Sequence, residues 1–368
     1  MITTRAAICR EPRSPWEIVD LELDEPKADE VRVRFHAAGL CHSDDHIQKG
    51  DARMRFPVVG GHEGAGVVEA VGEDVTRVAV GDHVVCAFIP ACGKCRYCST
   101  GHQNMCDEGK NASTGEFPDG TFRFHSGGED YGGLCVLGTF SQRAVLHEFS
   151  CVKIPDDIPF DVASLVSCGV PTGWGTAVYA GGVRPGETVV VYGAGGVGSN
   201  AVQGARYAGA KNVVVVDPVE FKRDMAKVFG ATHTFAGAEE AHEFVVETTW
   251  GQLADHALIT VGVLSDEVIA SAVNVVGKSG KVTITAVGPG QLDFPGGMLI
   301  GYQRRVQGAV FGACNPIYDI PRLLGLYRSG DLKLDELITK RYTLEQVNEG
   351  YQDMLDGKNI RGVIVHEH

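Results

Sequence analysis

Three features are missing from this 368-residue chain, and each absence excludes a class of protein. No stretch approaches the roughly 20 consecutive apolar residues that a membrane-spanning helix needs. The first residues, MITTRAAICREPRSPW, lack the apolar segment of a secretory signal and the acid-poor character of a transit peptide. Basic residues are in deficit, since 33 Lys and Arg face 47 Asp and Glu, for a net charge of −14. We therefore expect a cytoplasmic protein that binds neither membranes nor nucleic acid.

Low-complexity tracts and internal repeats are also missing, and the composition is that of a globular protein. Hydrophobic residues make up 44% of the chain, which excludes wholesale disorder. At about 150 residues per domain, the length predicts two to three domains. Glycine is the outlier with 48 residues, nearly twice the usual share of about 7%. This excess predicts many tight turns, or a backbone that closely approaches a ligand.

Eleven cysteines in a cytoplasmic chain are better explained as reduced metal ligands than as a disulfide framework. Four of them fall within the short stretch CGKCRYCSTGHQNMC. Four convergent thiolates close the tetrahedral shell of a zinc ion and leave no open position, so the site would be structural. A four-cysteine iron–sulfur cluster is the alternative, although the fourth cysteine is distant and no proline follows it. The predicted ligands are Cys92, Cys95, Cys98 and Cys106.

A glycine-rich motif lies between a predicted strand and a predicted helix. The β-branched run Thr188 to Tyr192 is typical of a buried parallel strand, and a helix-period segment follows the glycines. A second strand, Val213 to Val216, ends at Asp217. Strand, GxGxxG, helix and a distant acidic residue together indicate a dinucleotide site, in which Asp217 binds the ribose hydroxyls and favours NAD over NADP. The loop residues that would approach the pyrophosphate are Gly193, Gly195, Gly196, Val197 and Gly198.

Further metal-binding residue types are spread along the chain. Cys41 opens the segment CHSDDH, His62 lies in GHEGAG, and Cys168 lies in LVSCGVP. Each is weak by itself, because a lone cysteine is more often a buried small hydrophobe. Spacing alone does not join them.

Taken in order, these segments resemble those of the zinc-dependent medium-chain alcohol dehydrogenases. The resemblance covers essentially the whole chain. It is strongest to the branch of liver enzymes and glutathione-dependent formaldehyde dehydrogenases, because residues 109–140 retain that branch's long segment. The chain also resembles the actinobacterial nicotinoprotein alcohol dehydrogenases, which hold NAD without exchanging it and are assayed with an artificial acceptor such as nitrosodimethylaniline (NDMA). Residue-level arguments do not separate these branches.

The resemblance implies a catalytic zinc ion bound by Cys41, His62 and Cys168, in addition to the structural one. Hydride would pass between a zinc-bound alkoxide and the nicotinamide of NAD, and a proton relay would run through Ser43 and His46. Asp44 would accept the second N–H of His62. Glu63 would lie beside the metal.

Other assignments implied by the resemblance are less specific. His42 matches a position that contacts the cofactor pyrophosphate and is often arginine in the family. A neutral histidine there would hold phosphate less tightly, which fits poorly with a cofactor that does not exchange. The remaining matches are Lys222 and Arg361 for the cofactor ribose and phosphate, Thr172 and Val197 behind the nicotinamide ring, and Phe88 in the wall of the substrate pocket.

The order of these features predicts an α/β protein with two domains. A GroES-like, β-rich catalytic domain would comprise residues 1–169 and 313–368 and carry both zinc sites, and its first part is expected to be all-β. A doubly wound parallel sheet of the Rossmann type would comprise residues 170–312. Its predicted elements are strands at 213–216, 258–261 and 281–286 and helices near 221–229 and 267–276.

The partners follow from the same resemblance. We expect an alcohol or aldehyde substrate, a homodimer or homotetramer with residues 306–311 as a dimer seam, and an external electron acceptor if the chain is a nicotinoprotein. S-(hydroxymethyl)glutathione dehydrogenase activity is an alternative. A DNA-binding zinc protein and a catalytically silent cofactor-binding protein are the alternatives from other classes, and the net charge of −14 disfavours the first.

Overall fold

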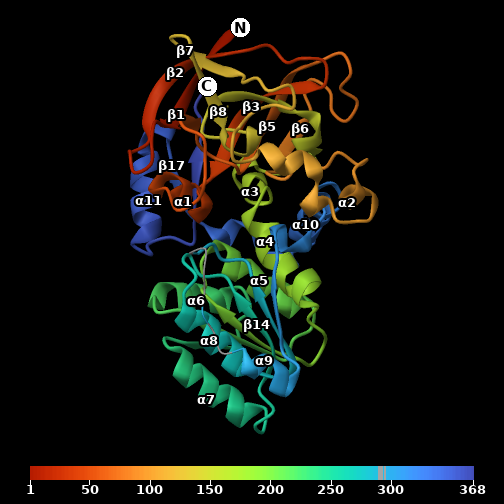
Figure 1. Cartoon of the computed structure of the whole chain (residues 1–368), viewed down its shortest axis with the longest axis vertical. Helices are drawn as coiled ribbons and strands as arrows, with labels where there is room; N and C mark the ends of the chain where they lie inside the picture. Colours follow the sequence, from red (N-terminus) through yellow and green to blue (C-terminus); the bar gives the residue numbers. More distant parts are fainter. Residues whose placement is uncertain (289–292, 294–295) are drawn as a thin grey trace. The chain divides into compact units, whose positions relative to one another are not determined.

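The computed structural model describes the whole chain except residues 289–292 and 294–295. Two compact units are present (Figure 1). The first comprises Met1–Cys168, Asn315–Gly330 and Leu334–His368, and the second comprises Gly169–Cys314 and Asp331–Lys333. None of the helices in the described residues is long and apolar enough to cross a bilayer.

Twelve strands dominate the first unit. They are β1 (Ile2–Cys9), β2 (Glu17–Leu23), β3 (Glu30–Gly39), β4 (Val58–Val59), β5 (Gly64–Val71), β6 (His83–Cys86), β7 (Phe124–Ser126), β8 (Glu129–Gly133), β9 (Arg143–His147), β10 (Cys151–Lys153), β17 (Ile338–Tyr342) and β18 (Arg361–Val365). Short helices connect them: α1 (His42–Lys49), α2 (Arg96–Ser99), α3 (Phe160–Leu165), α10 (Pro316–Ser329) and α11 (Val347–Leu355), with 3₁₀ turns η1 (Gln103–Met105), η2 (Asp107–Asn111), η3 (Leu134–Val136), η4 (Glu148–Ser150), η7 (Asp335–Leu337) and η8 (Leu344–Gln346).

These strands form a closed barrel and a seven-stranded sheet. The barrel order is β1-β2-β7-β8-β4, and the sheet order is β10-β6-β5-β3-β18-β17, with β9 also paired to β3. Strand β18 pairs antiparallel with β3, so the C-terminal segment completes a sheet begun near the N-terminus. In Figure 1, β17 and α11, drawn in blue, accordingly lie beside the red α1 within this unit.

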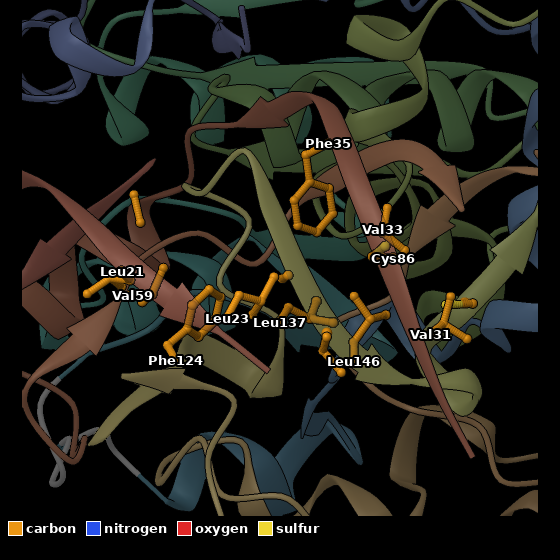
Figure 2. Close-up of a cluster of buried hydrophobic side chains, with 14 of the residues drawn as sticks. Leu21, Leu23, Val31, Val33, Phe35, Val59, Cys86, Phe124, Leu137 and Leu146 are labelled. Carbon is orange, nitrogen blue, oxygen red and sulfur yellow. The ribbon is translucent and has the colours of Figure 1, made fainter. Parts of the chain in front are cut away.

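The core of the first unit lies between the barrel and the sheet strands. Figure 2 shows apolar side chains from β2, β3, β7 and β9 pointing toward one another, among them Leu23, Val33 and Leu146. Along β3 the buried positions Val31, Val33 and Phe35 alternate with less buried arginines, which is the period-2 pattern of a strand with one face in the core. Burial of these side chains fixes the register of β3, and β3 leads directly to Cys41.

The second unit is an open parallel sheet with helices. Its elements are α4 (Gly169–Gly175), the π-helix η5 (Thr176–Gly181), β11 (Thr188–Tyr192), α5 (Gly196–Tyr207), β12 (Asn212–Val216), α6 (Glu220–Val228), β13 (His233–Phe235), α7 (Ala238–Thr248), β14 (Ala254–Ile259), α8 (Asp266–Val275), β15 (Val276–Ile284), α9 (Gly297–Tyr302), β16 (Arg305–Gly308) and the 3₁₀ turn η6 (Phe311–Ala313).

Strand order identifies the type of parallel sheet. The six strands run β13-β12-β11-β14-β15-β16, and every pair is parallel. Counted from β11, this is the order 3-2-1-4-5-6 of the doubly wound dinucleotide-binding fold. The predicted fold class is therefore confirmed. The chain reverses its winding direction between β11 and β14, which is where such sheets bind ligands.

The first unit differs from the sequence expectation in one respect, because it is β-rich rather than all-β. Helix α1 follows Cys41 directly and buries Asp44, Asp45, His46 and Ile47. Its acidic residues lie in the first turn, where they interact favourably with the helix dipole. Burial of these side chains stabilises the helix within a unit that is otherwise rich in strands.

A helical glycine of the second unit tests how tightly that unit packs, and a helical glycine of the first unit serves as the control. A Cβ at Gly204 of α5 would lie 2.6 Å from the Trp174 carbonyl oxygen of α4, whereas a Cβ at Gly325 of α10 would meet no atom within 4 Å. We predict that Gly204→Ala lowers the melting temperature despite the better helix propensity of alanine. Gly325→Ala should raise the free energy of unfolding by about 0.5 to 1 kcal/mol. Thermal unfolding of both variants checks this, and an unchanged melting temperature for Gly204→Ala would contradict the close packing.

Candidate metal centre and cofactor loop

Side chains from three distant parts of the sequence converge within the first unit. Cys41 follows β3, His62 precedes β5, and Cys168 follows α3. One ligand atom from each of these residues, together with a carboxylate oxygen of Glu63, lies within 4.8 Å of all the others. The structure therefore brings together the three residues that the sequence resemblance implied as zinc ligands.

Backbone hydrogen bonds explain this convergence. The Gly39 amide at the end of β3 donates to the Glu63 carbonyl at 3.1 Å, which places the residue after β3 beside the start of β5. The Ser167 hydroxyl accepts from the Gly64 amide at 3.0 Å and donates to the Gly64 carbonyl at 3.1 Å. Residues close to all three candidate ligands are thus hydrogen-bonded at the start of β5, which restricts where the ligands can lie.

Asp44 orients the His62 imidazole. Its Oδ1 atom lies 3.1 Å from His62 Nδ1 and also accepts from the Gly61 amide at 3.1 Å. Both side chains are almost fully buried. A carboxylate on Nδ1 fixes the tautomer that presents Nε2 to a metal ion, which is the usual second partner of a metal-binding histidine.

The electrostatics of the cluster favour anionic sulfur beside a cation. The contact with Cys168 lowers the pKa of Cys41 well below its usual value, and the charge of His62 contributes. The same contact, with burial, raises the pKa of Cys168. Burial opposes a charge on His62, but the Asp44 carboxylate and Cys41 outweigh it and raise the pKa of His62. One thiolate is therefore stabilised in a site from which water is largely excluded.

Glu63 is engaged by a buried partner. Arg361 Nη2 on β18 donates to its Oε2, and both side chains are buried. Burial raises the pKa of Glu63, and Arg361 opposes that rise. A Cβ at Gly39 would collide with both groups of the pair, so only glycine leaves room for it. Arg361 Nε has no hydrogen-bond partner in the described residues.

The chemistry of this donor set fits zinc. Two thiolates and one neutral imidazole are the Cys₂His set of a catalytic zinc site, and two thiolate charges balance the charge of the ion. The orienting carboxylate of Asp44 is already in place. Three close donors leave a fourth position of a tetrahedral shell for another ligand.

Helix α1 carries the two predicted relay residues, and one of them contacts this cluster. Ser43 Oγ lies 3.6 Å from Cys41 Sγ. His46 is buried, and its Nδ1 lies 3.0 Å from Asp51 Oδ2. The Asp51 side chain is 54% exposed, so it connects the buried imidazole to solvent. Sequence reasoning missed Asp51, because an acidic residue after a helix-ending Gly50 carries no motif.

The cysteine-rich stretch forms the second cluster. The four predicted sulfur atoms lie within 4.8 Å of one another, and two of the separations are 3.9 and 4.0 Å. A tetrahedron with Zn–S bonds of about 2.3 Å has edges of about 3.8 Å, so these separations match a zinc shell. Backbone amides of Cys95 and Cys98 donate to Cys92 Sγ and Cys95 Sγ. The spacing that predicted this Cys₄ site reflects this local turn geometry.

The glycine loop connects β11 to α5 in the second unit. Gly193 has φ +90°, and a Cβ there would lie 2.9 Å from Val261 Cα, so the position requires glycine. A Cβ at Gly195 would meet no atom within 4 Å, which leaves open space above the loop. Helix α5 begins at Gly196 without a side-chain cap, so its first amides are available to an anion.

Asp217 lies at the end of β12 and holds the glycine loop. Its Oδ2 accepts from the Ala194 amide at 2.8 Å, and its Oδ1 accepts from the Val219 amide at 2.9 Å. Each carboxylate oxygen has a second lone pair for a hydroxyl group. Asp217 therefore has a structural role that its sequence distance from the glycines did not indicate.

The remaining predicted residues are distributed over both units. In the first unit, the Phe88 ring packs edge-on against the His62 ring at 5.7 Å, and the His42 ring lies 6.5 Å from that of His46. In the second unit, Thr172 is buried on α4, Val197 lies in the first turn of α5, and Lys222 is half-buried on α6. Their roles toward a cofactor or substrate stay predictions.

Comparison with known proteins agrees with this arrangement. Residues 27–156 match the model of the alcohol dehydrogenase GroES-like domain, and residues 196–329 match that of the zinc-binding dehydrogenases. The chain is 58% identical to an NDMA-dependent alcohol dehydrogenase of Amycolatopsis methanolica, over 99% of both chains. It is 58% identical to a putative alcohol dehydrogenase D of Mycobacterium tuberculosis, over 99% of this chain and 100% of that protein.

Solved structures give the same result. An alcohol dehydrogenase zinc-binding domain protein from Burkholderia ambifaria superimposes with a TM-score of 0.93 at 31% identity, and both chains are fully covered. The benzyl alcohol dehydrogenase of Acinetobacter calcoaceticus gives 0.91 at 29% identity, again over both whole chains. The protein belongs to the zinc-binding alcohol dehydrogenase family. Within that family, its predicted similarity to the actinobacterial NDMA-dependent group is confirmed.

Removal of one ligand tests whether the Cys₄ cluster holds a structural zinc ion. Cys95→Ala should remove one zinc ion per chain and lower the melting temperature by at least about 5 °C, because a structural metal contributes folding free energy directly. Zinc analysis and thermal unfolding measure both effects. The control Cys9→Ala removes a buried cysteine outside both clusters and should leave the zinc content unchanged. Full zinc content in Cys95→Ala would refute the structural site.

Proposed function

We propose that the protein is a zinc- and NAD-dependent alcohol dehydrogenase that interconverts alcohols and aldehydes or ketones. The observation that carries this proposal is the convergence of Cys41, His62 and Cys168, with Asp44 already on the imidazole. In this proposal Cys92, Cys95, Cys98 and Cys106 hold a second, structural zinc ion. A bound zinc ion would supply a Lewis acid for the substrate oxygen, and NAD would supply the hydride acceptor.

The residues around the cluster have separate tasks. Asp44 holds the His62 tautomer, so the imidazole presents Nε2 in a fixed direction. Phe88 packs on the edge of His62 and gives the site an apolar wall, which excludes water from a substrate carbon. Arg361 neutralises Glu63 and keeps that carboxylate beside the site without an unpaired buried charge.

The proton of the alcohol needs a route out of a buried site. Ser43, beside Cys41, accepts the alcohol proton at Oγ and releases its own hydroxyl proton outward. His46, at the outer end of the relay, receives a proton at Nε2. The bond to Asp51 favours the Nδ1–H tautomer of His46, in which Nε2 is the accepting nitrogen. The half-exposed carboxylate of Asp51 then faces water.

The glycine loop and Asp217 support NAD as the proposed cofactor. The uncapped amides at the start of α5 suit a pyrophosphate, and Gly195 leaves space for it. The buried carboxylate of Asp217 would accept hydrogen bonds from the ribose hydroxyls. The same carboxylate would disfavour the 2′-phosphate of NADP. Both features support NAD.

One relative favours a more specific version of this function. The 58% identity to an NDMA-dependent enzyme supports a nicotinoprotein that retains NAD and passes electrons to an external acceptor. His42, in place of the arginine common in the family, argues in the opposite direction. S-(hydroxymethyl)glutathione dehydrogenase activity has the weaker support of 34% identity to a class-3 alcohol dehydrogenase of Dictyostelium discoideum. We also propose that the protein is a homodimer or homotetramer and that it is cytoplasmic.

Removal of one candidate ligand tests the central proposal. We expect Cys168→Ala to retain one zinc ion per chain and to lose at least about a hundredfold in the rate of alcohol oxidation, because the remaining donors no longer hold an ion in place. The melting temperature should stay close to that of the wild type. Cys151 is another buried cysteine of the first unit, and the control variant Cys151→Ala should keep both zinc ions and full activity. Retention of full alcohol oxidation by Cys168→Ala would overturn the proposal.

The nicotinoprotein version has its own test. Protein purified without added nucleotide should release near-stoichiometric NAD, and little NADP, on denaturation. It should also oxidise primary alcohols with nitrosodimethylaniline when no NAD is supplied. Chromatography of the released nucleotide and an acceptor assay measure the two properties. Protein that carries no dinucleotide and turns over only with added NAD would be an exchanging dehydrogenase instead.

A further inference from the structure

Two cysteines outside both metal clusters face each other across the sheet of the first unit. Cys86 ends β6 and Cys151 begins β10, and the two residues are directly opposed in the antiparallel pairing of these strands. Directly opposed residues of an antiparallel pair carry their side chains on the same face of the sheet. Both cysteines are buried in the core of the first unit, where Figure 2 shows Cys86. The register therefore places two buried thiols side by side.

The backbone hydrogen bonds around this pair suit a disulfide bond. The Ala87 amide donates to the Ser150 carbonyl at 2.9 Å, so the ladder bond joins the flanking residues and the cysteines occupy a non-hydrogen-bonded position. Opposed Cα atoms at such positions lie about 4.5 Å apart, within the range of about 4.4 to 6.8 Å found for disulfides. The structure holds both residues as free cysteines. Their oxidation therefore requires little movement of the backbone.

Packing alone does not require sulfur at this pair. The neighbouring ladder positions of the same two strands are Val84, Val85 and Val152. Valine is enriched in strands and would fill a buried ladder position as well as cysteine does. Cysteine at both members of a single pair adds a chemical property that valine lacks, which is the capacity to form a covalent cross-link.

Strand β10 is the part of this pair that can open. It has three residues, lies at the end of the sheet order and pairs only with β6 among the strands of the described chain. Short edge strands open locally at a lower free energy than central strands. At the surface, Lys153 Nζ lies 2.6 Å from Asp82 Oδ1 and ties the end of β10 to the residue before β6. Local opening of β10 would expose both thiols to solvent.

The closed sheet protects the thiols from reaction. The neighbouring Cys151 thiol and burial raise the pKa of Cys86 well above its usual value, so Cys86 stays a thiol while β10 is paired. The thiolate is the reactive form in disulfide exchange. Reaction is therefore coupled to the opening of the edge strand.

The segment between the two cysteines carries the Cys₄ cluster. Its two ends run together, because the Ala91 amide donates to the Phe149 carbonyl at 2.9 Å. Phe149 also packs against the cysteines of that cluster. A covalent bond between β6 and β10 would fasten both ends of this segment.

We propose that Cys86 and Cys151 form a reversible redox site whose disulfide fastens the segment that carries the Cys₄ cluster. The oxidant is a low-molecular-weight disulfide such as glutathione disulfide. Cys151, once exposed and deprotonated, attacks this disulfide and releases one glutathione. Cys86 then attacks the Cys151 sulfur of the mixed disulfide and releases the second glutathione. Two protein thiols become one disulfide, and their two electrons and two protons pass to the two glutathione thiols.

The redox site goes beyond the proposed function, and it is reversible because a reducing compartment returns such disulfides to thiols. The experiment incubates the full-length protein with glutathione disulfide, alkylates the remaining thiols and identifies cross-linked peptides by mass spectrometry. We expect a Cys86–Cys151 cross-link with unchanged zinc content. The melting temperature should rise by at least about 3 °C, because the cross-link closes a long loop of the unfolded chain.

Matched variants test the site and its opening. Cys86→Ala and Cys151→Ala should each abolish the cross-link and the rise in melting temperature, whereas Cys9→Ala, which removes a buried cysteine elsewhere, should retain both. Lys153→Ala should speed cross-linking by about two- to fivefold, the range that loss of a surface ion pair accounts for. Lys227→Ala removes an exposed ion pair with Asp224 on α6 and should leave the rate unchanged.

Three outcomes would overturn the inference. Glutathione adducts without the cross-link, or disulfides only among the Cys₄ residues with loss of zinc, would show that the pair is not the redox site. A cross-link that leaves the melting temperature unchanged would show that it does not fasten the segment. Equal acceleration in Lys227→Ala would show that opening is not local to β10. Failure of the proposed function would appear instead as absent alcohol oxidation by the untreated protein.

Discussion

The bond between Asp44 and His62 is the interaction on which the site depends. It is buried, it fixes the imidazole, and through Oδ1 it also holds the Gly61 amide and therefore the turn that precedes β5. In a low-dielectric interior such a bond is strong only if every member is satisfied. The surrounding structure keeps this carboxylate buried and holds it in the orientation that His62 needs.

The fold meets that requirement through the ends of strands. Strands β3 and β5 are central in their sheet, so core burial sets their registers. Cys41 and His62 lie next to the ends of these strands, and the strand registers therefore fix their positions. Cys168 arrives from a helix, and Ser167 ties it to β5. The C-terminal strand β18 adds Arg361 from the other side of β3. A site assembled from four distant segments is thus as rigid as the sheet beneath it.

Local chemistry explains which parts could be predicted from the sequence. The Cys₄ cluster and the loop at Gly193 are encoded within short stretches, because the spacing itself sets the turn geometry. Cys41, His62 and Cys168 required the family resemblance, since nothing local indicates that they meet. The Glu63–Arg361 pair and the position of Asp51 were not predicted. Both depend on which segments the sheet and α1 bring together, and such long-range pairing has no periodic signature.

The two clusters also show how cysteine ligands suit both a structural site and a catalytic site. Four thiolates in the Cys₄ cluster complete a tetrahedral shell and leave nothing for a substrate. At Cys41, His62 and Cys168 the fourth nearby donor is a carboxylate, but Arg361 already binds it and balances its charge. A carboxylate paired in this way competes weakly for a cation, since coordination would break a buried ion pair. On the proposed function, Arg361 therefore keeps the fourth position open for an alcohol oxygen, and Gly39 is the small residue that makes room for this pair.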